Sequence, residues 1–342
     1  MQIIITGGAG FLGVRLARQI LKVGELAING NAPQSVTSVV LVDRAVPPPD
    51  LAGDSRVTVV VGELNALLSP AAMPSAATAS PLPLLGSHTA LVYHLAAAVS
   101  GECEADFDLG MRSNLDATRA LLEACRALNT APMVVFASSL AVFGNSAAQP
   151  LPDVIEDNTL PTPQNSYGIQ KFIGEQLVAD YGRKGFITAR NVRLMTVSVR
   201  PGKPNGAASS FLSGMIREPL NGVSGRCPVP RDTAVALSSP DRTIEGLLRA
   251  ASASQAEWGA LTAVNLPAIS TTAGAMAEAL ARIAGTPCAD LIDWTPDAAI
   301  TRIVSSWPAK INAVRARKLG LMPDADIDSL IAAYLAEFKA SA

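Results

Sequence analysis

The chain has 342 residues, of which 49% are hydrophobic and 16% are charged, and its formal net charge is −2 at pH 7. This composition allows a sizeable core and excludes a mainly disordered chain, and the absence of a basic cluster argues against nucleic acid as a partner. The four cysteines are scattered and there are only two histidines, which argues against a disulfide framework, a metal site and a serine–histidine–aspartate triad.

The chain opens directly into a strand-like segment, MQIIIT, with no charged start or cleavage site of a signal peptide. Its longest apolar runs, such as residues 90–99, are too short to cross a bilayer. We therefore expect a cytoplasmic protein without a membrane partner.

A glycine-rich turn follows the first predicted strand, residues 2–6. The segment TGGAGFLG places Gly7, Gly10 and Gly13 three positions apart, and a helical pattern over 12–24 begins within it. Glycine permits a positive φ and lets a pyrophosphate approach the backbone amides at the start of a helix. A tight turn without a ligand would also use glycine, but this position after the first strand favours a dinucleotide site.

The second predicted strand, 39–43, ends at Asp43. A carboxylate there can accept both hydroxyls of an adenosine ribose and repels a 2′-phosphate, so it favours NAD over NADP. Asp43 lies further beyond Gly13 than is usual, and the neighbouring Arg44 could instead meet a 2′-phosphate. Asp43 could also be a simple turn residue. We expect NAD.

Strand-like runs continue at 57–61, 89–95, 132–137 and 187–193, and helical patterns at 104–129 and 166–183 lie between them. Nearly continuous apolar strands alternating with helices indicate a parallel sheet covered on both faces. We predict an α/β fold in which residues 1–193 form a doubly wound, Rossmann-type NAD-binding domain, to which later segments return. Residues 194–342 should form a smaller, mostly helical substrate lobe, with helices at 207–217, 241–253, 271–284 and 326–338.

Three side chains of this predicted domain can act together. Ser139 follows the strand 132–137, and Tyr167 and Lys171 lie one helical turn apart in NSYGIQK. An isolated Tyr-x-x-x-Lys is usually a solvated helix face. Beside a dinucleotide, however, the lysine would favour the phenolate of a tyrosine whose ordinary pKa of about 10 makes it a poor base.

Together these motifs resemble the extended short-chain dehydrogenases/reductases. The resemblance covers nearly the whole chain: TGGAGFLG, LVD, HLAA (94–97), SSLAVFG, YGIQK and ARKLGL (316–321). It implies that Tyr167 is the general base or acid, that Lys171 lowers its pKa and holds the nicotinamide ribose, and that Ser139 rather than Ser138 positions the reacting oxygen. The chain departs from the family pattern at Glu63, where aspartate is usual, and at Phe143, where tyrosine is usual.

The resemblance also assigns the remaining cofactor contacts and an assembly. The cofactor-binding residues it implies are Gly7, Gly10, Phe11, Leu12, Gly13, Asp43, Glu63, Leu64, Leu95, Ala96, Ala97, Asn114, Tyr167 and Lys171. The helices at 104–129 and 166–183 resemble a pair that forms a four-helix dimer interface in the family. The apolar side of the second helix, Ile169, Phe172, Ile173 and Leu177, would face either its neighbouring helix or the partner.

The stretch 197–220 bears on the substrate. It carries cations and small polar groups that suit a compact anionic polyhydroxy ligand: Arg200, Lys203, Asn205, Ser209, Ser210 and Arg217, beside Ser139 and Tyr167. The same cations could hold a diphosphate, and Arg217 could simply pair with Glu218 or Asp241. We favour Arg217 for a carboxylate, with Arg200 and Lys203 as the next candidates, because the planar fork of Arg217 can bind one bidentately, which Lys203 cannot do.

This stretch is similar, nearly residue for residue, to a group within the family, the D-erythronate dehydrogenases. The resemblance implies NAD-dependent oxidation of the 2-hydroxyl of a four-carbon sugar acid. One alternative is a nucleotide-sugar 4-epimerase or dehydratase, which uses the same three catalytic residues. Another is an NAD-sensing binding protein of the same fold, although a sensor would need none of the three.

Overall fold

The computed structural model describes residues 1–68, 84–202, 204 and 206–341. Its centre is a seven-stranded sheet in the order β13-β9-β7-β6-β1-β4-β5, and every neighbouring pair is parallel. The strands are β1 (Gln2–Thr6), β4 (Ser38–Asp43), β5 (Val57–Val61), β6 (Thr89–His94), β7 (Met133–Ser139), β9 (Thr188–Leu194) and β13 (Val264–Asn265). The doubly wound sheet predicted from the sequence is confirmed.

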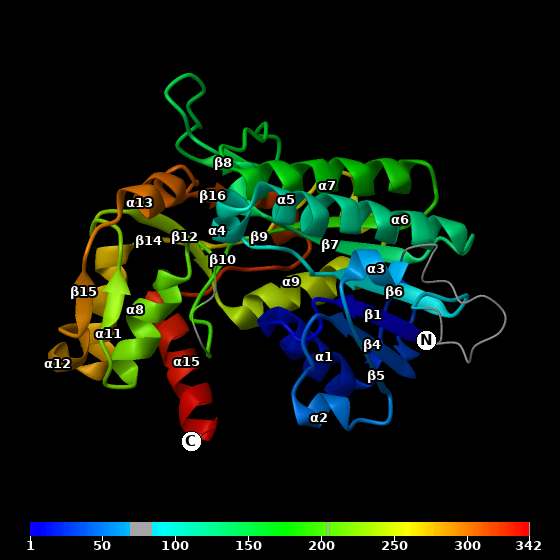
Figure 1. The fold of residues 1–342 in the computed structure, drawn as a ribbon, viewed down its shortest axis with the longest axis horizontal. Helices are drawn as coiled ribbons and strands as arrows, with labels where there is room; N and C mark the ends of the chain where they lie inside the picture. The colour runs from blue at the N-terminus through cyan, green and yellow to red at the C-terminus, as the bar shows by residue number, and fades with distance from the viewer. Residues whose placement is uncertain (69–83, 203, 205, 342) are drawn as a thin grey trace.

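Alternate side chains of these strands pack into two separate cores. Ile3 and Ile5 of β1 face α1 (Phe11–Val23) and α9 (Pro240–Ser252), whereas Ile4 faces α6 (Ala117–Ala127) and α7 (Ser166–Arg183). The two helical layers cover the sheet on both sides (Figure 1). Because α9 and β13 follow the first part of the lobe in sequence, the chain returns to the central sheet after leaving it.

The order of the strands creates a switch point between β1 and β6. From β1 the chain adds β4 and β5 on one side, and then β6, β7 and β9 on the other. Ligands of open α/β sheets bind at such a point, beyond the carboxyl ends of the strands.

The helix predicted at 104–129 is interrupted. It consists of α4 (Ser100–Ala105), α5 (Phe107–Gly110), a π-helical turn η2 (Met111–Asp116) and α6. Asp106 separates the first two with an extended backbone, φ −136° and ψ 96°, and its carboxylate accepts the Leu109 N–H at 2.9 Å. An aspartate that caps a new helix here explains the break.

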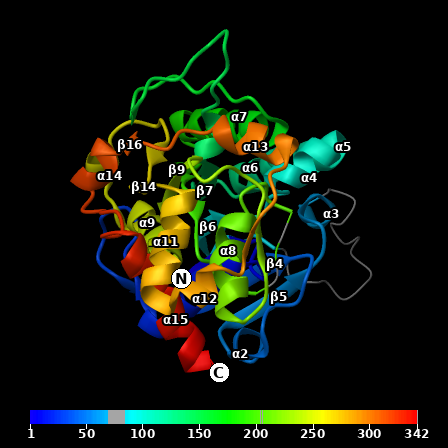
Figure 2. The same ribbon diagram turned by 90° about the vertical axis from the view of Figure 1, so that its left-hand side faces the viewer.

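The lobe that was predicted to bind the substrate has a core of its own and lies at the left of Figure 1; Figure 2 views it face on. The helices α8 (Phe211–Leu220), α11 (Ala273–Ala284) and α15 (Ile327–Ser341) enclose this core, to which Met215, Leu280 and Ile331 belong. The lobe also holds small sheets that the sequence analysis does not predict: β10 (Thr196–Val197), β12 (Ala234–Ser238) and β14 (Ile269–Thr272) in one, β11 (Gly225–Cys227) and β15 (Ile292–Trp294) in another.

The remaining elements are short connections. They are β2 (Glu25–Leu26), β3 (Gln34–Ser35), α2 (Pro49–Ala52), α3 (Leu64–Leu68), η3 (Leu140–Val142), β8 (Ile155–Glu156), α10 (Gln255–Trp258), α12 (Thr286–Ala289), α13 (Ala298–Ser305), β16 (Ile311–Asn312) and α14 (Val314–Lys318). Within the described residues, no helix has the length and apolar character needed to cross a membrane.

Candidate active site

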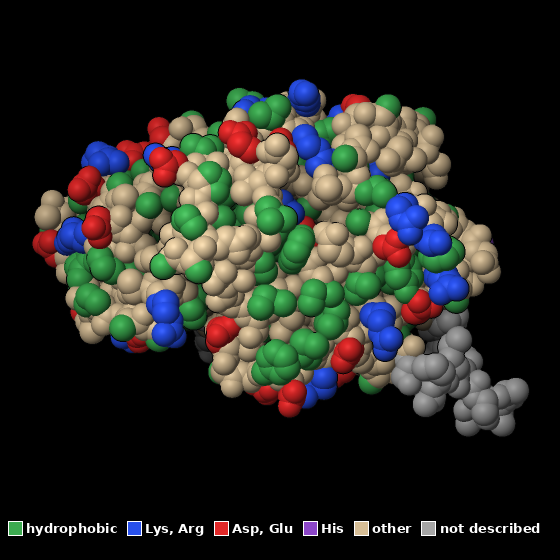
Figure 3. All heavy atoms as spheres, turned by 90° about the horizontal axis from the view of Figure 1, so that it is seen from above, with side chains coloured by type: hydrophobic (Ala, Val, Ile, Leu, Met, Phe, Trp, Pro, Cys, Tyr) green, Lys and Arg blue, Asp and Glu red, His purple; other side chains and the backbone are tan. Residues whose placement is uncertain are grey.

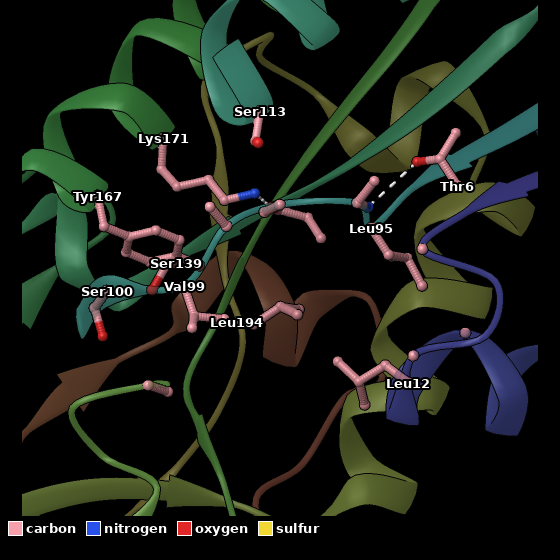
Figure 4. A pocket seen from close by; sticks show the side chains of 18 of the residues that line it. Thr6, Leu12, Leu95, Val99, Ser100, Ser113, Ser139, Tyr167, Lys171 and Leu194 are labelled. Atoms are coloured by element: carbon pink, nitrogen blue, oxygen red, sulfur yellow. Dashed lines mark hydrogen bonds between the residues drawn. The ribbon is translucent and has the colours of Figure 1, made fainter. Parts of the chain in front are cut away.

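A cavity of about 710 Å³ lies at the switch point, beyond the carboxyl ends of the parallel strands. Its walls come from both parts of the chain. The glycine turn and the ends of β4, β6 and β7 form one part of the lining. Another part consists of Thr196, Val197, Arg200, Ala207 and Ser209. Figure 4 shows the side chains that project into it.

The glycine turn forms one end of this cavity. Gly7 has φ +72°, and a Cβ on Gly13 would lie 2.1 Å from the carbonyl oxygen of Gly7, so both positions require glycine. No side chain caps the start of α1 at Gly10, which leaves the first amides of the helix available to an anion. Gly7, Gly10, Phe11, Leu12 and Gly13 all line the cavity. The turn therefore fits the pyrophosphate of a dinucleotide.

Asp43 lies beside this turn. Its carboxylate accepts the backbone N–H of Ala9 at 3.0 Å and that of Ala45 at 3.2 Å, and it lines the cavity. Arg44 forms an ion pair with Glu63 at 3.6 Å, so a neighbouring carboxylate offsets its charge. Glu63 and Leu64 line the same end. The structure thus places a carboxylate where an adenosine ribose would lie, and a partly neutralised arginine next to it.

The loop after β6 forms the middle of the wall through Leu95, Ala96 and Ala97. Asn114, predicted to contact the cofactor, does not line the cavity. Asn114 is 3% exposed. Its side-chain oxygen accepts the Ala98 N–H at 2.8 Å, and its side-chain nitrogen donates to the Ala98 carbonyl at 3.1 Å and to the Gln170 side-chain oxygen at 2.8 Å. Asn114 therefore fixes the loop from behind, and its neighbour Ser113 lines the cavity.

Ser139, Tyr167 and Lys171 lie at the opposite end of the cavity from Leu12 of the glycine turn (Figure 4). Helix α7 turns its polar face inward: Lys171 is 3% exposed, whereas Ile169 is 46% exposed. The close approach of α7 to the sheet requires a small residue at Gly174, where a Cβ would lie 2.6 Å from the Phe136 ring. Ile169 and Ile173 therefore face outward, on the side of the helix away from the buried Lys171.

Ser138 is engaged elsewhere, which supports Ser139 as the catalytic serine. The Ser138 hydroxyl donates to Glu175, and Glu175 forms a buried ion pair with Arg193 at 2.7 Å. The Ser139 hydroxyl accepts the Ala141 N–H at 3.1 Å and acts on the Tyr167 phenol through a hydrogen bond. Only the second serine is therefore directed at the tyrosine.

Burial dominates the ionisation of both groups on α7. It raises the pKa of Tyr167 to about 12, against the opposing effects of the hydrogen bond from Ser139 and the positive charge of Arg200. Burial lowers the pKa of Lys171 to about 8. The Lys171 ammonium donates to the Ala137 carbonyl at 2.8 Å and lies 5.8 Å from the centre of the Tyr167 ring. The sequence analysis expects Lys171 to lower the pKa of Tyr167. In the structure, burial outweighs the effects that lower it, and the pKa of Tyr167 is raised.

The predicted substrate residues separate into three groups. Arg200 and Ser209 line the cavity, Ser210 does not, and Lys203 and Asn205 lie outside the described residues. Arg217 does not line it either. Its side chain is 7% exposed, and its guanidinium donates to the Arg200 carbonyl at 2.7 Å and pairs with Glu218. The structure therefore corrects the preference for Arg217 as the carboxylate ligand.

The sequence analysis did not identify some residues of this end. Ser100, at the start of α4, directs its hydroxyl into the cavity near Ser139 (Figure 4), and Val99 and Leu194 form apolar wall. The Ser100 hydroxyl also accepts the Ala208 N–H at 3.0 Å, which ties the lobe to the nucleotide-binding domain. No motif marks a single serine in the loop and helix after a strand, so the sequence carried no signal for it.

Comparison with known proteins places this site in a family. Residues 82–233 match the NAD dependent epimerase/dehydratase family. The chain is 48% identical to the D-erythronate dehydrogenase of Cupriavidus necator, over 98% of both chains. It is 37% identical to the D-erythronate dehydrogenase of Haemophilus influenzae, over 98% of this chain and 99% of that one.

The chain belongs to the NAD dependent epimerase/dehydratase family, the extended short-chain dehydrogenases/reductases. A solved structure of a nucleoside-diphosphate-sugar epimerase from Agrobacterium tumefaciens is 36% identical, with a TM-score of 0.82 over 97% of this chain and 92% of that one. The family resemblance predicted from the sequence is confirmed, and with it a nicotinamide cofactor.

Proposed function

We propose that this member of the family is an NAD-dependent D-erythronate dehydrogenase that oxidises the C2 hydroxyl to a 2-oxo acid. The convergence of Ser139, Tyr167 and Lys171 in one cavity with the glycine turn and Asp43 carries the proposal. The near full-length similarity to two D-erythronate dehydrogenases supports this substrate. Asp43 supports NAD rather than NADP, because its charge would repel a 2′-phosphate.

In the proposed mechanism the side chains of this chain orient the substrate and move one proton. Tyr167, as phenolate, removes the proton of the C2 hydroxyl, and Ser139 hydrogen-bonds to the same oxygen. When bound, NAD⁺ brings a positively charged nicotinamide ring that accepts the hydride leaving C2. The C2–O bond becomes a carbonyl, so the products are the 2-oxo acid, NADH and one proton. Lys171 holds its charge beside the phenol and would contact the nicotinamide ribose.

The glycine turn and Asp43 would hold the two phosphates and the adenosine ribose, respectively. Leu95, Ala96 and Ala97 would lie against the cofactor, since they form the wall between the two ends of the cavity. The apolar wall near Tyr167 excludes water from the reacting carbon.

A spectrophotometric comparison of substrates tests the proposal. The protein is incubated with NAD⁺ and D-erythronate, L-threonate, five- and six-carbon sugar acids, L-threonine or UDP-glucose, and NADH is measured at 340 nm. We expect net NADH formation, fastest with D-erythronate. Conversion of UDP-glucose without net NADH would instead show an epimerase, and NAD⁺ binding without turnover of any compound would show a sensor.

We also propose that the enzyme is a homodimer. Ile169 and Ile173 of α7 are 46% and 37% exposed, and Phe107 of α5 is 61% exposed, whereas Phe172 and Leu177 pack against the protein's own core. Figure 3 looks down on the side of the molecule where α7 lies, and hydrophobic side chains gather there between scattered charges. Exposed apolar side chains on neighbouring helices support a protein–protein contact.

A further inference from the structure

Arg200 is an unpaired cation at the reactive end of the cavity. It lines the wall that also contains Ser139 and Tyr167, and its charge acts on the phenol of Tyr167. Its guanidinium makes no hydrogen bond or ion pair within the described part of the chain, in contrast to Arg217 directly behind it. Burial and the neighbouring Arg217 both lower the pKa of Arg200, which indicates a cation held without an anionic partner.

The backbone of Arg200, by contrast, is fixed on both sides by α8. The Arg200 N–H donates to the Ser213 hydroxyl at 3.0 Å, and the Arg217 guanidinium donates to the Arg200 carbonyl at 2.7 Å. Arg217 is itself paired with Glu218. Two buried side chains thus hold the main chain of one residue whose side chain remains free, which is the arrangement of a preorganised binding group.

The other cations among the described lining residues have different places. Arg44 pairs with Glu63, and the Arg112 carbonyl accepts a hydrogen bond from the Asn65 side chain. These contacts place Arg44 and Arg112 near the end of the cavity that holds Asp43. The Lys171 ammonium donates to the Ala137 carbonyl. Among the described lining residues, Arg200 is therefore the cation available to a substrate anion at the reactive end.

We propose that Arg200 binds the carboxylate of the substrate, and that Ser213 and Arg217 are positioning residues that hold Arg200 in place. This inference rests on the proposed function and names the group that selects its substrate class. Because Arg200 and Tyr167 line the same cavity and the charge of Arg200 acts on the phenol, an acid held by Arg200 would present its adjacent C2 hydroxyl to Tyr167. The class is thus 2-hydroxy carboxylates rather than nucleotide sugars, whose charge lies far from the reacting hydroxyl.

The test compares Arg200→Gln with the wild type on D-erythronate and on its uncharged amide. The wild type should prefer the acid strongly. Arg200→Gln should raise KM for the acid by about 30-fold or more, the effect expected when a buried charge pair loses one partner. It should change KM for the amide little and leave the Kd for NAD⁺ unchanged. Arg226→Gln, which removes a half-exposed arginine of the same lobe, is the matched control and should match the wild type.

The roles of Arg200 and Arg217 are separated by a double-mutant cycle. Arg217→Met should raise KM for the acid less than Arg200→Gln does, Arg217→Lys should restore most of the loss, and Arg217→Met should add nothing in the Arg200→Gln background. Additive effects would show that Arg217 does not act through Arg200.

The outcomes distinguish this inference from the proposed function. If the wild type oxidises D-erythronate and Arg200→Gln keeps both its KM and its preference for acid over amide, the inference is overturned while the proposed function stands. If the wild type oxidises no hydroxy acid, the proposed function fails first. A normal Kd for NAD⁺ shows that the variant is folded, so that an unchanged KM cannot be ascribed to a misfolded sample.

Discussion

At the scale of single residues, burial makes the charged forms of both Tyr167 and Lys171 less stable, although Lys171 remains mostly charged at neutral pH. The pKa of Tyr167 is raised to about 12 and that of Lys171 is lowered to about 8, each by desolvation. A phenolate is therefore rare in the protein alone at neutral pH, and positive charge near the phenol is what makes it accessible. Arg200 supplies part of this charge in the present structure. Perturbed groups of this kind gather at catalytic sites.

Tyr167→Phe should reduce kcat for D-erythronate by about 10³-fold or more while the Kd for NAD⁺ stays the same. The change removes the general base and keeps the packing of the ring. Steady-state kinetics and calorimetric NAD⁺ titration measure the two quantities. Tyr181→Phe, which removes a phenol of the same helix that bonds to Glu123, is the control and should retain full turnover. A fully active Tyr167→Phe enzyme would rule out the mechanism.

Asp43→Asn should reduce the preference for NAD⁺ over NADP⁺ by about tenfold or more, since it removes a negative charge at the ribose while keeping the side-chain shape. The ratio of kcat/KM for the two cofactors measures the effect. Glu63→Gln removes the other carboxylate of this end and should change the ratio less. If Asp43→Asn leaves the ratio unchanged, another residue discriminates between the cofactors.

At the scale of elements, the glycine turn and six of the seven strands of the main sheet could be predicted from the sequence, because local chemistry determines them. The break at Asp106 could not, since an aspartate within a helical pattern becomes a cap only when packing favours a second helix. β13 is two residues long and carries no periodicity of its own. The direction of the Arg217 side chain could not be predicted either. The sequence placed Arg217 on a helix, but only the packing of α8 shows that its side chain faces the Arg200 carbonyl instead of the cavity.

His94 couples β6 to its neighbours and should make stability depend on acid pH. It is fully buried, bonded to Thr6 at 2.7 Å and Thr118 at 2.9 Å, and burial lowers its pKa to about 3. Between pH 6.5 and 3 the unfolded chain therefore binds one more proton at this residue than the folded chain, so its contribution to stability falls as pH falls.

The free energy of unfolding should consequently drop by about 2–3 kcal/mol more in the wild type than in His94→Gln when the pH is lowered from 7 to 4.5. Urea denaturation at the two pH values measures this difference. His88→Gln, at the exposed second histidine, should behave as the wild type does. Equal slopes for the wild type and His94→Gln would show that His94 is not held neutral by burial.

At the scale of the whole molecule, the cavity needs both parts of the chain. The glycine turn, Asp43 and the proposed catalytic residues come from the part of the chain that builds the central sheet, whereas Arg200 and Ser209 come from the lobe. The Ser100–Ala208 hydrogen bond connects the two beside the reacting residues. Under the proposed function, substrate choice would depend on the lobe and the chemistry on the residues beside the sheet.

The proposed dimer predicts that the double substitution Ile169→Glu and Ile173→Glu yields a monomer. Two buried charges in an apolar interface would be costly, and neither side chain packs in the protein's own core. Sedimentation velocity at micromolar concentration measures the state. Val223→Glu, at an exposed apolar position of the lobe, is the control and should leave a dimer. A wild type that sediments as a monomer would contradict the proposal.

The central claim is that the chain removes a hydride from C2 of a sugar acid and releases the reduced cofactor. D-erythronate carrying deuterium at C2, incubated with NAD⁺ and the wild-type protein, tests it when the released cofactor is analysed by mass spectrometry. We predict NADH that carries one deuterium per molecule, formed together with an equal amount of 2-oxo acid, and no deuterium in NADH when the label is at C3. Unlabelled NADH from the C2-labelled acid, or deuterium returned to the sugar without net NADH, would contradict the account.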